Sequence, residues 1–286
     1  MTLKRALNFP LTRMVIGLLA IGGCIVLVES IRNLWLEGKP EDPESVNLIL
    51  SLLEIIFSVR VYILLYGNLE KRRITELSSS LFLKYSVAGF MLGLIIQSLA
   101  ILIIYWRKGY SIESVNSFLF MLPAVEQALV AGFVAELIFT GIIFRLAEEW
   151  LGTWIALAML TALFALAHIG VKGANLLSVS TTAIQSGILL SSAFVFSRSL
   201  WIPIFLHFGW DLAEPGIWGG INPGIKISNK LFNSHISGTE MLTGGAFGPG
   251  NSLTALILSL VTAILFLSIA RKKNRIIPPY WKRFSP

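Results

Sequence analysis

The feature that most constrains this chain is a series of continuous apolar segments of about 20 residues each. An α-helix of that length crosses the ~30 Å hydrocarbon core of a bilayer. Spanning segments must be helices or closed barrels, because lipid offers no partners to backbone N–H and C=O groups. The apolar residues run continuously instead of alternating, which favours helices over barrel strands.

These segments predict an all-α, polytopic bundle of about eight transmembrane helices, and therefore a multi-pass protein of the cell membrane. The expected spans are 11–35, 45–66, 85–106, 117–147, 153–169, 176–197, 200–214 and 252–270. The fifth and seventh are short, so we expect them to be tilted or covered by neighbours. Residues 215–251 form a long glycine- and proline-rich connection, which is typical of a lid or a binding loop.

Charge is scarce and unevenly placed. Charged residues make up 14% of the chain, against roughly 25% in soluble domains. The net charge is +7, but the basic runs 71–73 and 271–273 adjoin apolar segments, which fits contact with membrane lipids and no nucleic-acid partner. With a cytoplasmic N-terminus and eight spans, the cytoplasmic side holds roughly twice as many lysines and arginines as the outer side. We therefore predict that both termini are cytoplasmic.

Ionisable side chains inside the predicted spans are few, and each is a candidate for function because a charge in lipid is costly. They are Glu54, Arg60, Glu126, Glu136, His168, His207 and Asp211. Glu136 and His168 lie 16 residues on either side of Gly152. A tight turn there would place both about 24 Å from it, at one depth on neighbouring helices. His207 and Asp211 are spaced i,i+4 and share one helix face.

Two interpretations of these four polar residues stay open. Buried acids and imidazoles can form structural hydrogen bonds, or a polar patch at a helix end. Their scarcity favours catalysis or metal binding instead. The expected depth of His207 disagrees with a shared site, because His207 lies only about 12 Å from the turn near Ser199, whereas Glu136 and His168 lie about 24 Å from theirs. Either that turn dips inward, or a helix is tilted, or the span boundaries are displaced.

Three motifs carry a resemblance to a known family. They are AELIFTG at 135–141, FALAH at 164–168 and HFGWD at 207–211. In order and in placement they resemble the CPBP family, the CAAX prenyl protease and bacteriocin-processing (Abi) membrane proteins, which include type II CAAX endopeptidases. The family patterns are Glu-Glu-x-x-x-Arg, Phe-x-x-x-His, and His-x-x-x-Asn or His-x-x-x-Asp.

The resemblance implies an intramembrane metalloprotease that hydrolyses a peptide bond in a membrane-associated or lipidated peptide or protein. It makes Glu136, His168, His207 and Asp211 the candidate catalytic residues, and His168 and His207 candidate ligands of a divalent metal such as zinc. A carboxylate shielded from bulk water can act as a base near neutrality. Histidines with a carboxylate can also hold zinc and activate its bound water.

The resemblance also divides the chain. It implies N-terminal transmembrane helices at 1–114, a CPBP-like membrane core at 115–270, and a basic cytoplasmic tail at 271–286. The core begins before the first motif and ends with the last predicted span.

The chain departs from the family pattern at two positions. Ala135 stands where the motif has its first glutamate, usually taken as the base, and Thr140 stands where it has arginine. Three functions follow: a peptidase in which Glu136 acts as the base, a catalytically degenerate relative that binds a membrane peptide, and a proton-coupled transporter. The first is weakened because residues 135 and 136 point about 100° apart on a helix. The third lacks a visible inverted repeat.

Overall fold

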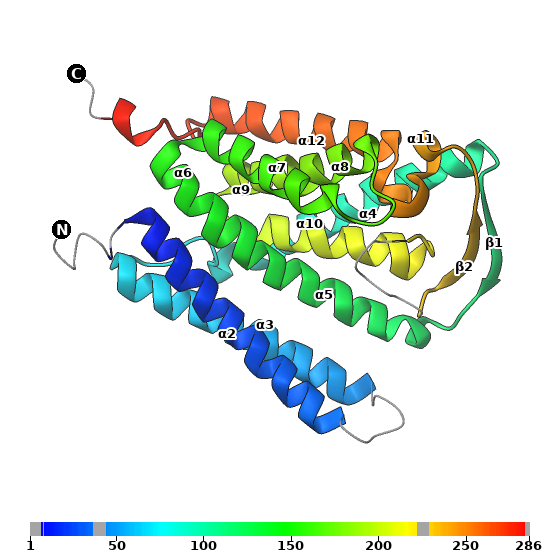
Figure 1. Cartoon of the computed structure of the whole chain (residues 1–286), viewed down its shortest axis with the longest axis horizontal. Coiled ribbons are helices and arrows are strands. Elements are labelled where there is room, and N and C mark those ends of the chain that lie inside the picture. The colour runs from blue at the N-terminus through cyan, green and yellow to red at the C-terminus, as the bar shows by residue number, and fades with distance from the viewer. Residues whose placement is uncertain (1–6, 8, 37–43, 222–228, 284–286) are drawn as a thin grey trace.

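The computed structural model describes residues 7, 9–36, 44–221 and 229–283. Over these residues the chain is an all-α bundle with one small sheet, which confirms the predicted fold class (Figure 1). Within the same residues, six helices are long and apolar enough to cross a membrane. They are Pro10–Trp35, Val46–Glu70, Ser79–Trp106, Phe118–Leu151, Leu176–Ser197 and Leu253–Lys272.

Each predicted span coincides with a helical segment. The helices are α2 (Pro10–Leu36), α3 (Glu44–Glu70), α4 (Phe82–Trp106), α5 (Leu122–Glu136), α6 (Arg145–Leu151), α7 (Thr153–Ile169), α8 (Leu176–Thr182), α9 (Leu190–Ser197), α10 (Trp201–Asp211), α11 (Glu240–Thr243) and α12 (Leu253–Lys272). Three π-helical segments continue them: η3 (Leu137–Phe144) joins α5 to α6, η4 (Ala183–Leu189) joins α8 to α9, and η5 (Leu212–Ile217) extends α10. The fifth predicted span is α7 and the seventh is α10 with η5, and both are short as expected.

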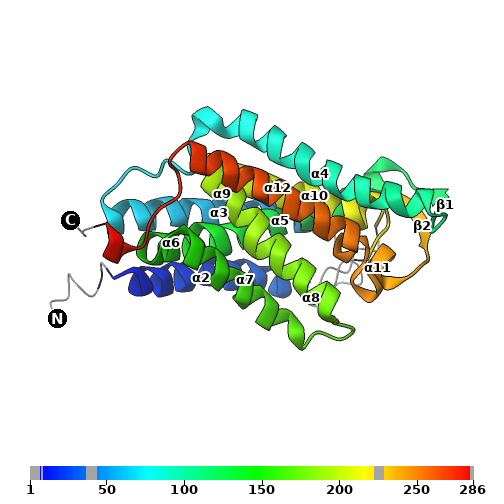
Figure 2. The ribbon, with the colours of Figure 1, turned by 90° about the horizontal axis from the view of Figure 1, so that it is seen from above.

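Helix α10 lies in the middle of the bundle and packs against α4, α5 and α9. The pair α2 and α3 lies on the outer side of α5, and α12 lies over α9 and η4 (Figure 1). Seen from above, α4 and α7 flank α12 on opposite sides (Figure 2). The helix that carries the third motif is therefore enclosed by other helices.

Glycines bring α4 and α10 into backbone contact. A Cβ added to Gly89 would lie 2.5 Å from the carbonyl oxygen of Ile202, and one added to Gly93 would lie 2.2 Å from that of Leu206. Small residues spaced four apart let helices approach this closely inside a membrane, where packing drives association. The position of α10 is thus set by the glycines of α4.

Within the connection after η5, residues 222–228 lie outside the described residues, and the described part contains a strand. Strand β2 (Phe232–Ile236) pairs antiparallel with β1 (Tyr110–Val115), with Tyr110 opposite Ile236 and Val115 opposite Phe232. The sheet lies at the end of the bundle away from the start of α2 and the end of α12 (Figure 1). The sheet joins the loop before α5 to the loop after η5. Helices α5 and η5 both line the cavity described below.

Both ends of the described chain meet at the end of α6. Arg13 of α2 pairs with Glu149 at 2.6 Å, and the Arg283 side chain donates to the Glu149 carbonyl oxygen at 2.8 Å. An even number of crossings brings both ends to one side, as the eight predicted spans require. Which side of the membrane this is stays a prediction.

Candidate active site

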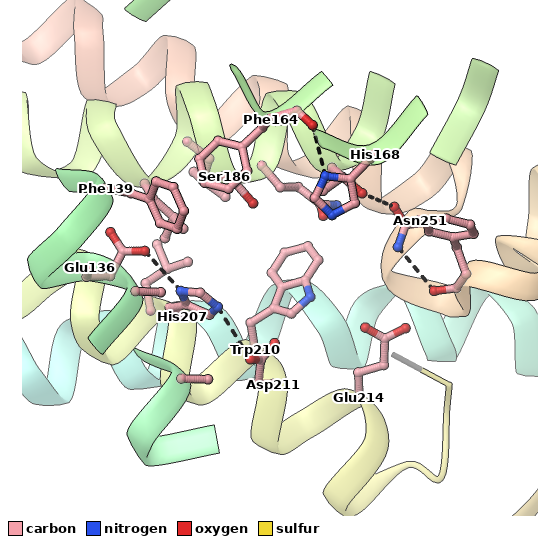
Figure 3. Close-up of a pocket in the computed structure, with 18 residues that line it drawn as sticks. Glu136, Phe139, Phe164, His168, Ser186, His207, Trp210, Asp211, Glu214 and Asn251 are labelled. Carbon is pink, nitrogen blue, oxygen red and sulfur yellow. Dashed lines mark hydrogen bonds and ion pairs between the residues drawn. The ribbon is translucent and has the colours of Figure 1, made fainter. Parts of the chain in front are cut away.

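The four residues singled out from the sequence line one cavity of about 360 Å³ (Figure 3). Glu136 ends α5, His168 lies in the last turn of α7, and His207 and Asp211 lie on α10. The hairpin between α6 and α7 turns at Gly152, as predicted. The structure therefore brings together residues up to 75 positions apart in the sequence.

His207 stands between two carboxylates. Its Nδ1 lies 2.9 Å from Oε1 of Glu136, and its Nε2 lies 3.4 Å from Oδ2 of Asp211. The His207 side chain is 22% exposed, whereas those of Glu136 and Asp211 are 2% and 6% exposed. A ring that donates from both nitrogens satisfies both contacts. The two acids fix the orientation of an imidazole that stays open to the cavity.

Both oxygens of Glu136 are engaged. Oε1 contacts His207, and Oε2 accepts a hydrogen bond from the Thr140 hydroxyl at 2.5 Å. Thr140 thus gives Glu136 a neutral donor at the position where the family pattern has an arginine. Ala135 and Glu136 both line the cavity, so the expected 100° offset does not turn Glu136 away from it. The helix changes to π geometry at the next residue, Leu137.

His168 enters the cavity from another side. Its Nδ1 lies 2.8 Å from the carbonyl oxygen of Phe164. A carbonyl oxygen only accepts, so Nδ1 is assigned the proton, and in the neutral ring Nε2 is left as an acceptor. Figure 3 shows the ring of His168 across the cavity from His207. A water molecule in the cavity would find an acceptor at this nitrogen.

The donor set does not fit a metal ion as arranged. Among the residues that the structure describes, no group of three or more His, Cys, Asp or Glu side chains is placed to hold one. Both nitrogens of His207 face carboxylates, and His168 offers Nε2 alone. Zinc sites use three or four converging ligands. We therefore derive no step through a metal, and the two-histidine metal site stays a prediction.

The turn before α10 is buried against neighbouring segments. Ser199 and Leu200 are buried, and the Leu200 N–H donates to the carbonyl oxygen of Glu76 at 2.8 Å. Arg198 pairs with Glu148 at 2.6 Å. The Glu148 carboxylate also accepts a hydrogen bond from Thr153, the first residue of α7, so the turns before α7 and α10 lie side by side. The 2.9 Å contact between His207 and Glu136 shows that these two residues nevertheless reach one depth.

A fifth ionisable side chain, Glu214, lines the same cavity and was not singled out from the sequence. It lies on η5, is 1% exposed, and accepts the Gly250 N–H at 2.6 Å. Glu214 follows Asp211 by three residues and His207 by seven, so it repeats the helical face that the third motif defines. That spacing was the available signal, but the residue falls at the last position of the predicted span.

The other ionisable positions lie away from the cavity. Glu126 on α5 accepts a hydrogen bond from Ser51 and lies 3.7 Å from Arg32. Glu54 on α3 is buried, and Arg60 on the same helix is exposed. Glu126 therefore belongs to the contact between α5 and the α2–α3 pair.

Part of the chain matches a known protein family. Residues 115–213 match the family described as Type II CAAX prenyl endopeptidase Rce1-like. The matched segment runs from the end of β1 into η5 and contains Glu136, His168, His207 and Asp211. No curated protein and no solved structure matches the chain.

Proposed function

We propose that the cavity of this chain hydrolyses a peptide bond in a membrane-associated or lipidated substrate. Through residues 115–213, the chain belongs to the Rce1-like family of CAAX-type membrane proteases. The family and the multi-pass membrane architecture are the premise. The substrate, the site and the chemistry are the proposal. The observation that carries it is the convergence of Glu136, His168, His207 and Asp211 on one cavity.

The roles follow from the contacts of each side chain. His168 holds the attacking water, because Nε2 is its acceptor toward the cavity. His207 contacts the substrate, with Glu136 and Asp211 holding its ring in place. Glu136 is a positioning residue in this scheme, since both of its oxygens are already engaged. Positioning of reacting groups alone can lower a barrier by several kcal/mol.

The walls of the cavity suit an apolar substrate. The aromatic residues Phe139, Phe164, Trp210 and Phe247 line it together with the polar groups. Phe139 and Phe164 pack with ring centroids 4.6 Å apart. Ligand sites are commonly apolar with a few placed polar groups. A peptide that carries a lipid, or that lies in the bilayer, could place its apolar part against these rings.

A second candidate is a degenerate family member that binds a membrane peptide without cleaving it. The observation that favours it is Ala135, which lines the cavity with a methyl group where the motif has an acid. A cavity without a base would keep its shape and its affinity but lose turnover. No contact among the described residues specifically favours the third alternative, a proton-coupled transporter.

The test is cleavage of a lipidated reporter peptide by the purified full chain in liposomes. We expect the wild type to cleave it and His168→Ala to be slower by about 100-fold or more, in the range of lost acid–base or positioning groups. The control is His235→Ala, because His235 is an exposed histidine on β2. Equal activity of His168→Ala and wild type would contradict the proposed site. Binding without cleavage, with activity gained in Ala135→Glu, would instead favour the degenerate relative.

A further inference from the structure

The cavity contains a buried acid that the proposed scheme does not yet use. Glu214 is 1% exposed, and among the described residues it has no lysine or arginine partner within ion-pair distance. Its contacts are with neutral donors, namely the Gly250 N–H at 2.6 Å and the indole of Trp210. A carboxyl group in such a place is costly to keep, and in a membrane protein it marks a functional site by default.

The surrounding chain is shaped around this carboxyl group. A Cβ on Gly250 would lie 2.3 Å from Oε2, one on Gly248 would lie 2.7 Å from Oε1, and one on Gly220 would lie 2.9 Å from Cγ. Gly248 also has a φ of +82°, which L side chains rarely adopt. A side chain at any of these three glycines would therefore crowd Glu214 in its present position.

The carboxyl group faces the place where hydrolysis is proposed. Figure 3 shows the Glu214 side chain pointing into the cavity, with His168 on the facing side and Asp211 beside it. Both carboxylate oxygens of Glu136 are hydrogen-bonded, and Ala135 has no side-chain oxygen. The π-helical geometry of η5 brings Glu214 to this wall, and π segments recur at functional sites. Among the described residues, the hydrogen bonds of Glu214 come from neutral donors, whereas Glu136 and Asp211 both contact His207.

We propose that Glu214 is the general base of this cavity, an inference that rests on the proposed hydrolytic function. The Glu214 carboxylate takes one proton from the water held by His168 while the water oxygen bonds to the carbonyl carbon. The carbonyl π electrons move to the carbonyl oxygen. When the C–N bond breaks, the carbonyl re-forms and Glu214 returns the proton to the leaving nitrogen. The products are a carboxylic acid and an amine, and the base is regenerated.

The first test is Glu214→Gln in the liposome cleavage assay. The amide keeps the shape and can still accept the Gly250 N–H, but it cannot take a proton. We expect kcat to fall by about 100-fold or more with KM little changed. The acid limb of the kcat–pH profile should also disappear from the residual activity. The matched control is Glu240→Gln, since Glu240 is exposed on α11, and it should keep wild-type kcat.

A second variant keeps the charge and moves it. Gly250→Ala places a methyl group 2.3 Å from Oε2, closer than real Cβ contacts, so the carboxylate must shift. We expect a kcat loss of about 10-fold or more, because displaced catalytic groups lose rate steeply. This variant decides the matter if Glu214→Gln fails to fold.

The outcomes separate this inference from the function on which it rests. An active wild type with Glu214→Gln at wild-type kcat overturns the role of Glu214 and leaves hydrolysis standing. An active wild type with an unchanged Gly250→Ala does the same. An inactive wild type overturns the hydrolytic proposal itself, and Glu214 with it. Loss in both variants with the Glu240→Gln control intact supports the assignment.

Discussion

The contact between α4 and α10 gives the sharpest structural prediction, because it positions His207 and Asp211. In Gly93→Ala the new Cβ would lie 2.2 Å from the Leu206 carbonyl oxygen, while real Cβ contacts essentially never fall below 3.0 Å. The helices must therefore separate by at least the difference, about 0.8 Å. Forcing a methyl group into a packed interface costs about 1–3 kcal/mol. A shift near 1 Å can also cost on the order of 100-fold in activity.

The assay for this variant is reversible unfolding by sodium dodecyl sulfate in mixed micelles, followed by tryptophan fluorescence. The matched control is Gly23→Ala on α2, because a Cβ there meets nothing within 4 Å. Alanine is also the better helix former, by about 1 kcal/mol. We expect Gly93→Ala to lose about 1–3 kcal/mol of unfolding free energy while Gly23→Ala loses none. Equal stability of the two variants would refute the close packing of α4 on α10.

Three further outcomes follow from the contacts. Thr140→Val should lower the unfolding free energy by about 1–3 kcal/mol, because Oε2 of Glu136 loses its buried donor; a change within about 0.5 kcal/mol, as at ordinary surface sites, would contradict that contact. Burial alone would raise the pKa of Glu76, but its hydrogen bonds with Arg72 and the charges of Arg72 and Arg145 outweigh burial and hold it below 4.5. Because the folded-state pKa of Glu76 is lower than the unfolded-state pKa, its ion pairs stabilise the folded protein above the unfolded-state pKa, and this stabilisation is lost as the pH falls through the folded-state pKa. The free energy of unfolding should therefore fall less over this acid range in Glu76→Gln than in the wild type. A chelator should leave cleavage unchanged, because the described donors of the cavity do not converge as a group of three or more metal ligands; loss of activity that zinc restores would contradict this and favour the predicted two-histidine site.

The helices were predictable because continuous apolar runs allow no other structure in lipid. The hairpin at Gly152 was also predictable, since its φ of +82° favours glycine. It correctly placed Glu136 and His168 at one cavity. The buried turn before α10 was not predictable, because its contacts are with Glu148 and with the chain near Glu76, which are both distant from it in the sequence.

Other features have no local signal in the sequence. The pairing of β1 with β2 joins segments more than 100 residues apart, without the alternating pattern of a longer sheet. The π-helical segments η3, η4 and η5 add a residue to a helical turn without changing the apolar pattern that predicts a helix. Glu214 had a local signal in its spacing from His207 and Asp211, but the approach of Gly248 and Gly250 to its carboxyl group comes from a distant part of the chain and was not predictable.

The central claim is that a peptide bond is hydrolysed by water at this cavity, and isotopically labelled water tests it most directly. Cleavage of a lipidated peptide by the full chain in liposomes is run in water enriched in oxygen-18, and the new carboxyl terminus is weighed by mass spectrometry. Hydrolysis predicts one heavy oxygen in that carboxyl group with the wild type, and little product with His168→Ala. Product formed at equal rates by both proteins, or an intact peptide with the wild type, would contradict the account.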